Sequence, residues 1–98
     1  MILERRSMLV TSYKIKYKKP AEKFILKNKL EGIRFIKAFD EISHNLSNVK
    51  KYDIKKYYCS EENFYRLRIG KYRAIFQING QEIIIIVFDI DSRGDIYK

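Results

Sequence analysis

The stretch from Phe64 to Phe76 constrains the fold more than any other part of the chain. In its first half, apolar residues alternate with Arg66 and Arg68, a period-two pattern that predicts a strand with one apolar and one charged face. Gly70-Lys71 predicts a two-residue turn into a second strand, which sets Arg68 directly opposite Arg73. Like charges that face each other across an antiparallel pair destabilise it, so we expect a polyanion to bind this face.

Before this hairpin, the sequence predicts one strand and two helices. Tyrosine and isoleucine alternate with lysine within Leu9–Tyr17, which predicts a strand. Pro20 suits the first turn of a helix that ends near Asn28, and a turn is expected within Lys29–Gly32 because glycine interrupts the pattern. Apolar residues at spacings of three and four then predict a second helix with a core-facing stripe. The stripe comprises Ile33, Ile36, Phe39, Ile42 and Leu46.

After the first hairpin, Asn79-Gly80 predicts a second one, because both positions of its tight turn need a positive φ. The apolar run Ile83–Phe88 predicts the central strand, and the register of the two turns puts Arg68, Arg73 and Ile86 in one row. The element order is β-α-α-β-β-β. We therefore expect an α+β fold, in which a two-helix hairpin packs on one face of a small, mainly antiparallel sheet and the arginines lie on the other.

The charge of the chain indicates its class of partner. Its 21 lysines and arginines exceed its 12 acidic residues and give 98 residues a net charge of +9. This excess favours nucleic acid over an anionic membrane surface or an acidic protein. Lysines and tyrosines alternate irregularly within Val49–Asn63, a mixture that fits either a surface that follows phosphates and stacks bases or a solvated loop. The length predicts a single domain, residues 12–98, preceded by an extension, residues 1–11.

Several classes of site are disfavoured by the composition. The chain has one cysteine, Cys59, and one histidine, His44, so it has no internal disulfide and too few such ligands for a closed zinc site. A single thiol suits a reducing cytoplasm. No apolar run approaches the roughly 18 residues that span a bilayer. We expect no metal, no cofactor and no membrane partner.

The segment Tyr65–Phe76, the order of the elements and the ending Arg93–Lys98 resemble the RelE/ParE superfamily of toxin–antitoxin toxins. The resemblance covers about Ser12 to Lys98 and is strongest over the last third. It implies a RelE-like fold, an antitoxin partner of the RelB type, and one of two activities. RelE-like members cut mRNA in the ribosomal A site, whereas ParE-like members inhibit DNA gyrase and have no nuclease site.

The resemblance also implies the site residues. By position, the RelE-like catalytic groups correspond to Arg66, Arg68, Arg73, Arg93 and Tyr97. Ser92 departs from the pattern, because many members have His or Lys there, and neither a histidine nor a carboxylate is obviously placed as a general base. The plain alternative is that the arginines form surface salt bridges with Glu61, Glu62 or Glu82. The lysines expected to bind the RNA backbone are Lys51, Lys55, Lys56, Lys71 and Lys98.

Our hypothesis for the chemistry is a ribosome-dependent cleavage of mRNA in which the RNA 2′-OH attacks the adjacent 3′ phosphate. Arginine is a poor base because its pKa exceeds about 12, but it binds phosphate oxygens and offsets developing charge. Arg73 and Arg93 take that role, Arg66 and Arg68 bind the backbone, and Tyr97 stacks on a base or exchanges a proton. The alternatives are a toxin that inhibits gyrase and a catalytically weakened RNA-binding relic.

Overall fold

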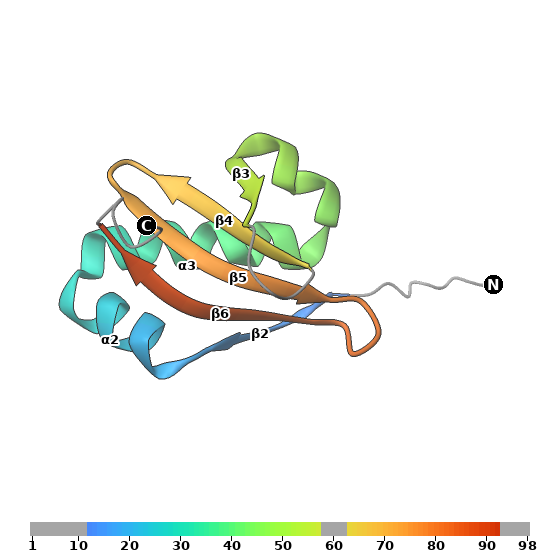
Figure 1. Ribbon diagram of the computed structural model, residues 1–98, viewed down its shortest axis with the longest axis horizontal. Coiled ribbons are helices and arrows are strands. Elements are labelled where there is room, and N and C mark those ends of the chain that lie inside the picture. The colour runs from blue at the N-terminus through green and yellow to red at the C-terminus, as the bar shows by residue number, and fades with distance from the viewer. Residues whose placement is uncertain (1–11, 58–62, 93–98) are drawn as a thin grey trace.

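The structure is a computed structural model, and it describes residues 12–57 and 63–92. These residues form a five-stranded sheet with two helices packed on one face (Figure 1). The elements are β2 (Lys14–Tyr17), α2 (Lys19–Lys27), α3 (Lys29–His44), the 3₁₀ helix η1 (Leu46–Lys51), β3 (Asp53–Lys56), β4 (Phe64–Ile69), β5 (Tyr72–Asn79) and β6 (Ile84–Asp91). The predicted α+β fold with a helical pair on one face is confirmed.

The sheet has the strand order β2-β6-β5-β4-β3. The β2 strand pairs with β6 in parallel, and the other three pairs are antiparallel. The central strand is β5, whereas the apolar run that was expected at the centre forms β6, one place away. The β3 strand has no clear strand pattern in the sequence and was not predicted, because Ile54 is the only apolar residue among its four residues. Pairing with β4, rather than a local pattern, makes this segment a strand.

The turn between β4 and β5 follows the prediction. Ile69 pairs with Tyr72, so the turn contains two residues, and Gly70 has a φ of 61°. An L-residue with a side chain is strained at this φ, whereas glycine adopts it at little cost. The turn fixes the register of the hairpin, and Arg68 stands directly opposite Arg73 as predicted.

The turn between β5 and β6 does not follow the prediction. Asn79 pairs with Ile84, which leaves four residues, 80–83, in the turn. The Asn79 Oδ1 accepts hydrogen bonds from the backbone N–H groups of Gln81 and Glu82, at 3.0 and 3.1 Å. The asparagine therefore acts through its side chain instead of adopting a positive φ. The hairpin is confirmed, but the predicted register is wrong: Ile86 lies opposite Gln77, not in the row of Arg73.

The helices also correct two expectations. No turn lies within Lys29–Gly32, because α3 begins at Lys29. A Cβ atom on Gly32 would lie 2.9 Å from the Cα of Ile25, so this glycine allows α2 and α3 to approach each other closely. Asn28 alone separates the two helices, and its Nδ2 donates to the backbone carbonyl of Phe24 at 3.1 Å.

The core lies between the helices and the sheet. Phe39 and Ile42 of the predicted stripe are buried on α3, but Ile33 and Ile36 are exposed by 60% and 41%. Leu46 lies beyond α3, at the start of η1, and is exposed by 36%. The buried line runs through Phe35 and Phe39 instead, because their rings fill the space against the sheet. Phe39 meets the Phe76 ring of β5 edge to face, with 5.0 Å between centroids. The fully buried side chains also include Leu67, Ile85 and Val87.

Candidate nucleic-acid interface

The face of the sheet opposite the helices carries a row of four charged residues, one from each of four strands. Cross-strand partners share a face, and the pairings place these residues side by side. In order they are Asp53, Arg68, Arg73 and Asp91. The two arginines that oppose each other are thus flanked by a carboxylate on either side. The two carboxylates reduce the repulsion between the arginines. The sequence did not predict them, because neither the β3 strand nor the register of β6 was predicted correctly. We call this surface, with Arg66, Arg68 and Arg73, the arginine face.

Arg66 stands in the next row, between Lys55 of β3 and Ile75 of β5. Its Nη2 lies 3.6 Å from the Oδ1 of Asp53, and the side chains of Arg66 and Asp53 are 21% and 49% exposed. The Nε of Arg66 is buried and has no hydrogen-bond partner among the described residues. An ion pair at this distance and exposure stabilises the fold only weakly. The salt-bridge alternative therefore holds for Arg66 in a weak form, with Asp53 rather than a glutamate as partner.

Aromatic rings lie beside the arginines on the same face. Phe64 of β4 points to the same side as Arg66, two residues later, and its ring stacks on Phe88 of β6 with 5.2 Å between centroids. Both rings are half-buried. Basic side chains next to aromatic rings are the combination with which proteins bind single-stranded nucleic acid, because the rings stack on bases.

The structure distributes the predicted lysines over several places. Lys55 is brought to the arginine face, where it pairs with Arg66, and Lys56 follows it on the exposed edge strand. Lys71 lies in the β4–β5 turn, with its Nζ 5.6 Å from the centroid of the Tyr72 ring. Lys51 ends η1, just before β3. Arg93, Tyr97 and Lys98 lie outside the described residues.

The described part of the stretch that mixes lysines and tyrosines forms η1 and β3 instead of a plain loop. Tyr52 donates a hydrogen bond of 2.6 Å from its hydroxyl to the Oε1 of Glu41 on α3. This hydrogen bond, with burial and the charge of Glu41, raises the pKa of Tyr52 to about 12. Burial, with a smaller effect of Asp40, likewise raises the pKa of the Tyr17 hydroxyl to about 12. Both phenols are fixed in the fold and remain protonated at neutral pH.

The single histidine and the single cysteine were considered as possible site residues in the sequence. His44 is exposed at the end of α3, and its Nδ1 lies 2.7 Å from the backbone carbonyl oxygen of Asp40. Cys59 lies outside the described residues. Within residues 12–57 and 63–92, no three acidic, histidine or cysteine side chains gather where they could hold a metal ion. No helix in that part of the chain is long and apolar enough to cross a membrane.

Comparison with known proteins is consistent with this architecture. A family model described as the ParE toxin of type II toxin–antitoxin systems, parDE, matches residues 15–97. A chain of the archaeal RelE–RelB complex from Pyrococcus horikoshii OT3 is 26% identical, with a TM-score of 0.71 over 85% of this chain and 97% of that one.

Two further toxin structures share the fold. A chain of the RelB–RelE antitoxin–toxin complex from Methanococcus jannaschii is 30% identical, with a TM-score of 0.64 over 84% of this chain and 94% of that one. The isolated E. coli RelE toxin, at 15% identity, has a TM-score of 0.66 over 88% of this chain and 92% of that one, which shows a likeness of fold alone. No curated protein sequence matches the chain.

Proposed function

The chain belongs to the ParE toxin family of type II toxin–antitoxin systems, within the RelE/ParE superfamily, and we propose that it is a RelE-like toxin that cuts mRNA on the ribosome. The observation that carries the proposal is the arginine face. Arg68 and Arg73 oppose each other on two strands, with Arg66 in the adjoining row. This concentration of positive charge suits an anion with closely spaced phosphates.

In the proposed reaction, the 2′-oxygen of the RNA attacks the adjacent phosphorus, and the 5′-oxygen of the next nucleotide leaves. Arg73, with Arg93, stabilises the additional negative charge on the phosphorane, while Arg66 and Arg68 hold the backbone. One group must accept the proton of the 2′-OH and another must give a proton to the leaving 5′-oxygen. Tyr97 exchanges one of these protons or stacks on a base. Asp53 and Asp91 lie in the same row as Arg68 and Arg73, so either carboxylate is a candidate acceptor of the 2′-OH proton.

Dependence on the ribosome follows from the modest acid–base equipment of the face. Most of the acceleration would come from alignment of the 2′-oxygen with the phosphorus, because such alignment can remove a large part of the activation free energy. The ribosome presents mRNA in a fixed conformation, which the small arginine face cannot impose alone. The toxin would therefore act in the cytoplasm, through the unit of residues 12–98, with residues 1–11 as an extension.

A RelB-like antitoxin is the proposed protein partner. The toxin structures that this chain resembles include RelE–RelB complexes. The outer side of the helical pair exposes Leu26, Leu30 and Ile33 by 71%, 78% and 60%. An apolar surface of this kind, on a protein with a net charge of +9, suits an amphipathic helix with acidic flanks.

The antitoxin proposal is tested by co-purification with the product of a neighbouring small open reading frame that encodes an acidic protein. Leu30→Asp should abolish co-purification, whereas Lys37→Gln on the same helix should not. Equal retention of the partner by both variants would place its binding site elsewhere.

Inhibition of DNA gyrase is the second candidate function, and the match to a ParE family model is the observation that favours it. Primer-extension mapping of a translated mRNA after induction of the toxin separates the two functions. Cuts within translated codons that disappear in Arg73→Gln and Tyr97→Phe are expected for the nuclease. Intact mRNA together with altered DNA supercoiling would refute the nuclease and favour the gyrase inhibitor.

A further inference from the structure

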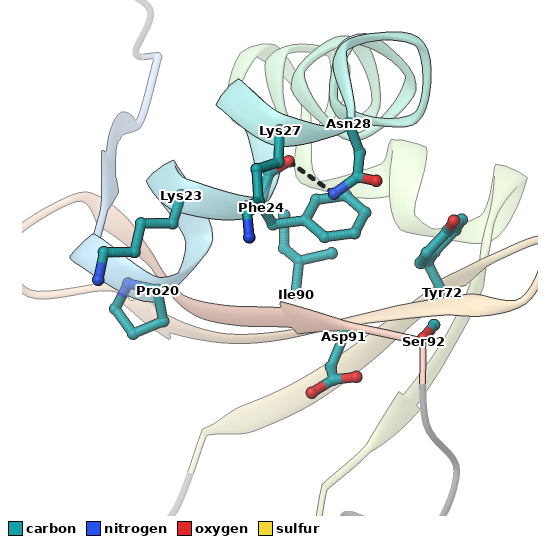
Figure 2. Close-up of a pocket in the computed structure, with 9 residues that line it drawn as sticks. All are labelled: Pro20, Lys23, Phe24, Lys27, Asn28, Tyr72, Ile90, Asp91 and Ser92. Atoms are coloured by element: carbon teal, nitrogen blue, oxygen red, sulfur yellow. Dashed lines mark hydrogen bonds between the residues drawn. The ribbon is translucent and has the colours of Figure 1, made fainter.

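A cavity of about 360 Å³ lies between α2 and the place where β5 begins and β6 ends (Figure 2). It is separate from the arginine face, since it opens on the side of the sheet that the helices cover. The lining residues come from α2 and the residue that follows it, from the start of β5 and from the end of β6. Those that matter to the argument are Lys23, Phe24, Lys27, Asn28, Tyr72 and Ile90.

The inside of the cavity is aromatic. The rings of Phe24 and Tyr72 meet edge to face, with 5.0 Å between centroids and 66° between planes. Ile90, which is buried, lies below the Phe24 ring, and the side chain of Asn28 lies above it (Figure 2). Two half-buried rings beside the aliphatic side chain of Ile90 form an apolar wall against which a flat group can pack.

The rim of the cavity is basic. Lys23 and Lys27 border it from α2, and Lys19 continues the same spacing of four, so the three ammonium groups follow one ridge of the helix. Like charges at this spacing destabilise a helix. All three side chains are exposed. The fold does not need this ridge, and an anion bound across it would offset the repulsion.

The Asn28 amide supplies a polar group with a defined pattern. One N–H of its Nδ2 is used by the Phe24 carbonyl. Among the described residues, no other hydrogen bond uses the second N–H or the amide oxygen of Asn28, so one donor stands beside one acceptor. An asparagine amide pairs in this way with the N6 and N7 edge of adenine.

We propose that this cavity binds one nucleotide of the RNA, with its base packed against the rings of Tyr72 and Phe24 and its phosphate on Lys23 and Lys27. The pattern at Asn28 makes adenine the preferred base. The proposal rests on the proposed function, because it assigns the cavity to the same substrate.

The position of the cavity supports an RNA strand as the source of that nucleotide. Tyr72 lines the cavity, and the next residue, Arg73, belongs to the arginine face. Asp91 borders the cavity and also stands opposite Arg73 in the charged row. A strand that passes around the end of the sheet would therefore meet both surfaces in succession.

Calorimetric titration of the purified full-length protein with AMP, adenosine and CMP tests the site. We expect AMP to bind more tightly than either adenosine or CMP. The double variant Lys23→Gln/Lys27→Gln should weaken the binding of AMP by about tenfold, as expected for loss of a charged hydrogen bond to phosphate. Its affinity for adenosine should be unchanged. The matched control Lys29→Gln/Lys37→Gln removes the same charge from α3 and should leave AMP binding unchanged.

Three results would overturn the proposal. They are an AMP affinity equal to that of adenosine, an equal loss in both double variants, and failure of an adenylate ribo-oligonucleotide to compete with AMP. The last result would make the cavity a site for free nucleotides. Cleavage of mRNA distinguishes this failure from failure of the proposed function. A protein that cuts mRNA normally but does not bind AMP refutes only the cavity, whereas one that binds AMP and the oligonucleotide but cuts nothing refutes only the nuclease.

Discussion

The two faces of the sheet are built from alternate residues of the same strands, yet they differ in what their side chains contribute. On the covered face, Leu67, Ala74 and Phe76 are fully buried against the helices. On the other face, Arg68 and Arg73 sit side by side and remain in reach of solvent. Burial of apolar area stabilises the fold, whereas opposed like charges do not. Substitutions on the two faces should therefore separate stability from activity.

The largest effect is expected on the covered face. Phe76→Ala removes the ring that meets Phe39 edge to face and should lower the free energy of unfolding by about 3–5 kcal/mol. Urea denaturation measures this change. The adjacent Gln77→Ala, on the open face, should change it by less than about 0.5 kcal/mol. Similar losses in the two variants would show that both faces contribute equally to stability.

The converse effect is expected for Arg68→Gln. This substitution removes one of the two opposed charges, and the loss of repulsion roughly balances the loss of attraction to Asp53 across β3. Stability should change by less than about 0.5 kcal/mol, while mRNA cleavage falls by about tenfold, as expected for the loss of a charged hydrogen bond to the RNA backbone. Full cleavage by a stably folded Arg68→Gln would remove this arginine from the site.

The close approach of the helices gives an intermediate effect. Gly32→Ala places a Cβ atom 2.9 Å from the Cα of Ile25, and backbone cannot move aside as a flexible side chain can. Overpacking should outweigh the better helix propensity of alanine, for a net loss of about 1–2 kcal/mol in urea denaturation. Lys37→Ala, on the exposed side of α3, is the control and should be nearly neutral. A more stable Gly32→Ala would mean that the helices are not held this closely.

The smallest effect concerns a phenol at the margin of the covered side. The pKa of Tyr52 is raised to about 12 in the folded protein from its usual value of 10.0. Because the folded state holds the proton more tightly, this group stabilises the protein fully below pH 10, and its contribution is lost as the pH rises towards 12. Tyr52→Phe should flatten the decline in stability over that window. An unchanged decline would show that the Glu41 hydrogen bond is absent in solution.

The sequence was most informative where local chemistry decides the geometry. The β4–β5 hairpin was predicted to the residue, because Gly70 permits a two-residue turn and the alternation on β4 has one consistent reading. The β5–β6 turn was predicted, but the register of the strands that it joins was not. The side chain of Asn79 binds two backbone N–H groups there, and no sequence rule separates this use of asparagine from a positive φ.

The rest depends on contacts between distant parts of the chain. Gly32 was predicted to lie in a turn but lies within α3, where a glycine is needed because Ile25 of α2 comes so close. Asp53 and Asp91 reach the arginine row because β3 pairs with β4 and β6 pairs with β5. No local sequence pattern predicts these registers. The lysines of the α2 ridge recur at a spacing of four, but no prediction was drawn from them, because their relation to Tyr72 required the fold.

The most direct test of the central claim is cleavage of mRNA by the purified protein on ribosomes programmed with a defined codon in the A site. We expect the wild-type protein to cut within that codon, Arg73→Gln to lose at least tenfold in rate at unchanged stability, and Lys37→Gln to cut at the wild-type rate. Intact mRNA with the wild-type protein, or equal cutting by Arg73→Gln, would contradict the assignment of the arginine face as the site that acts on mRNA.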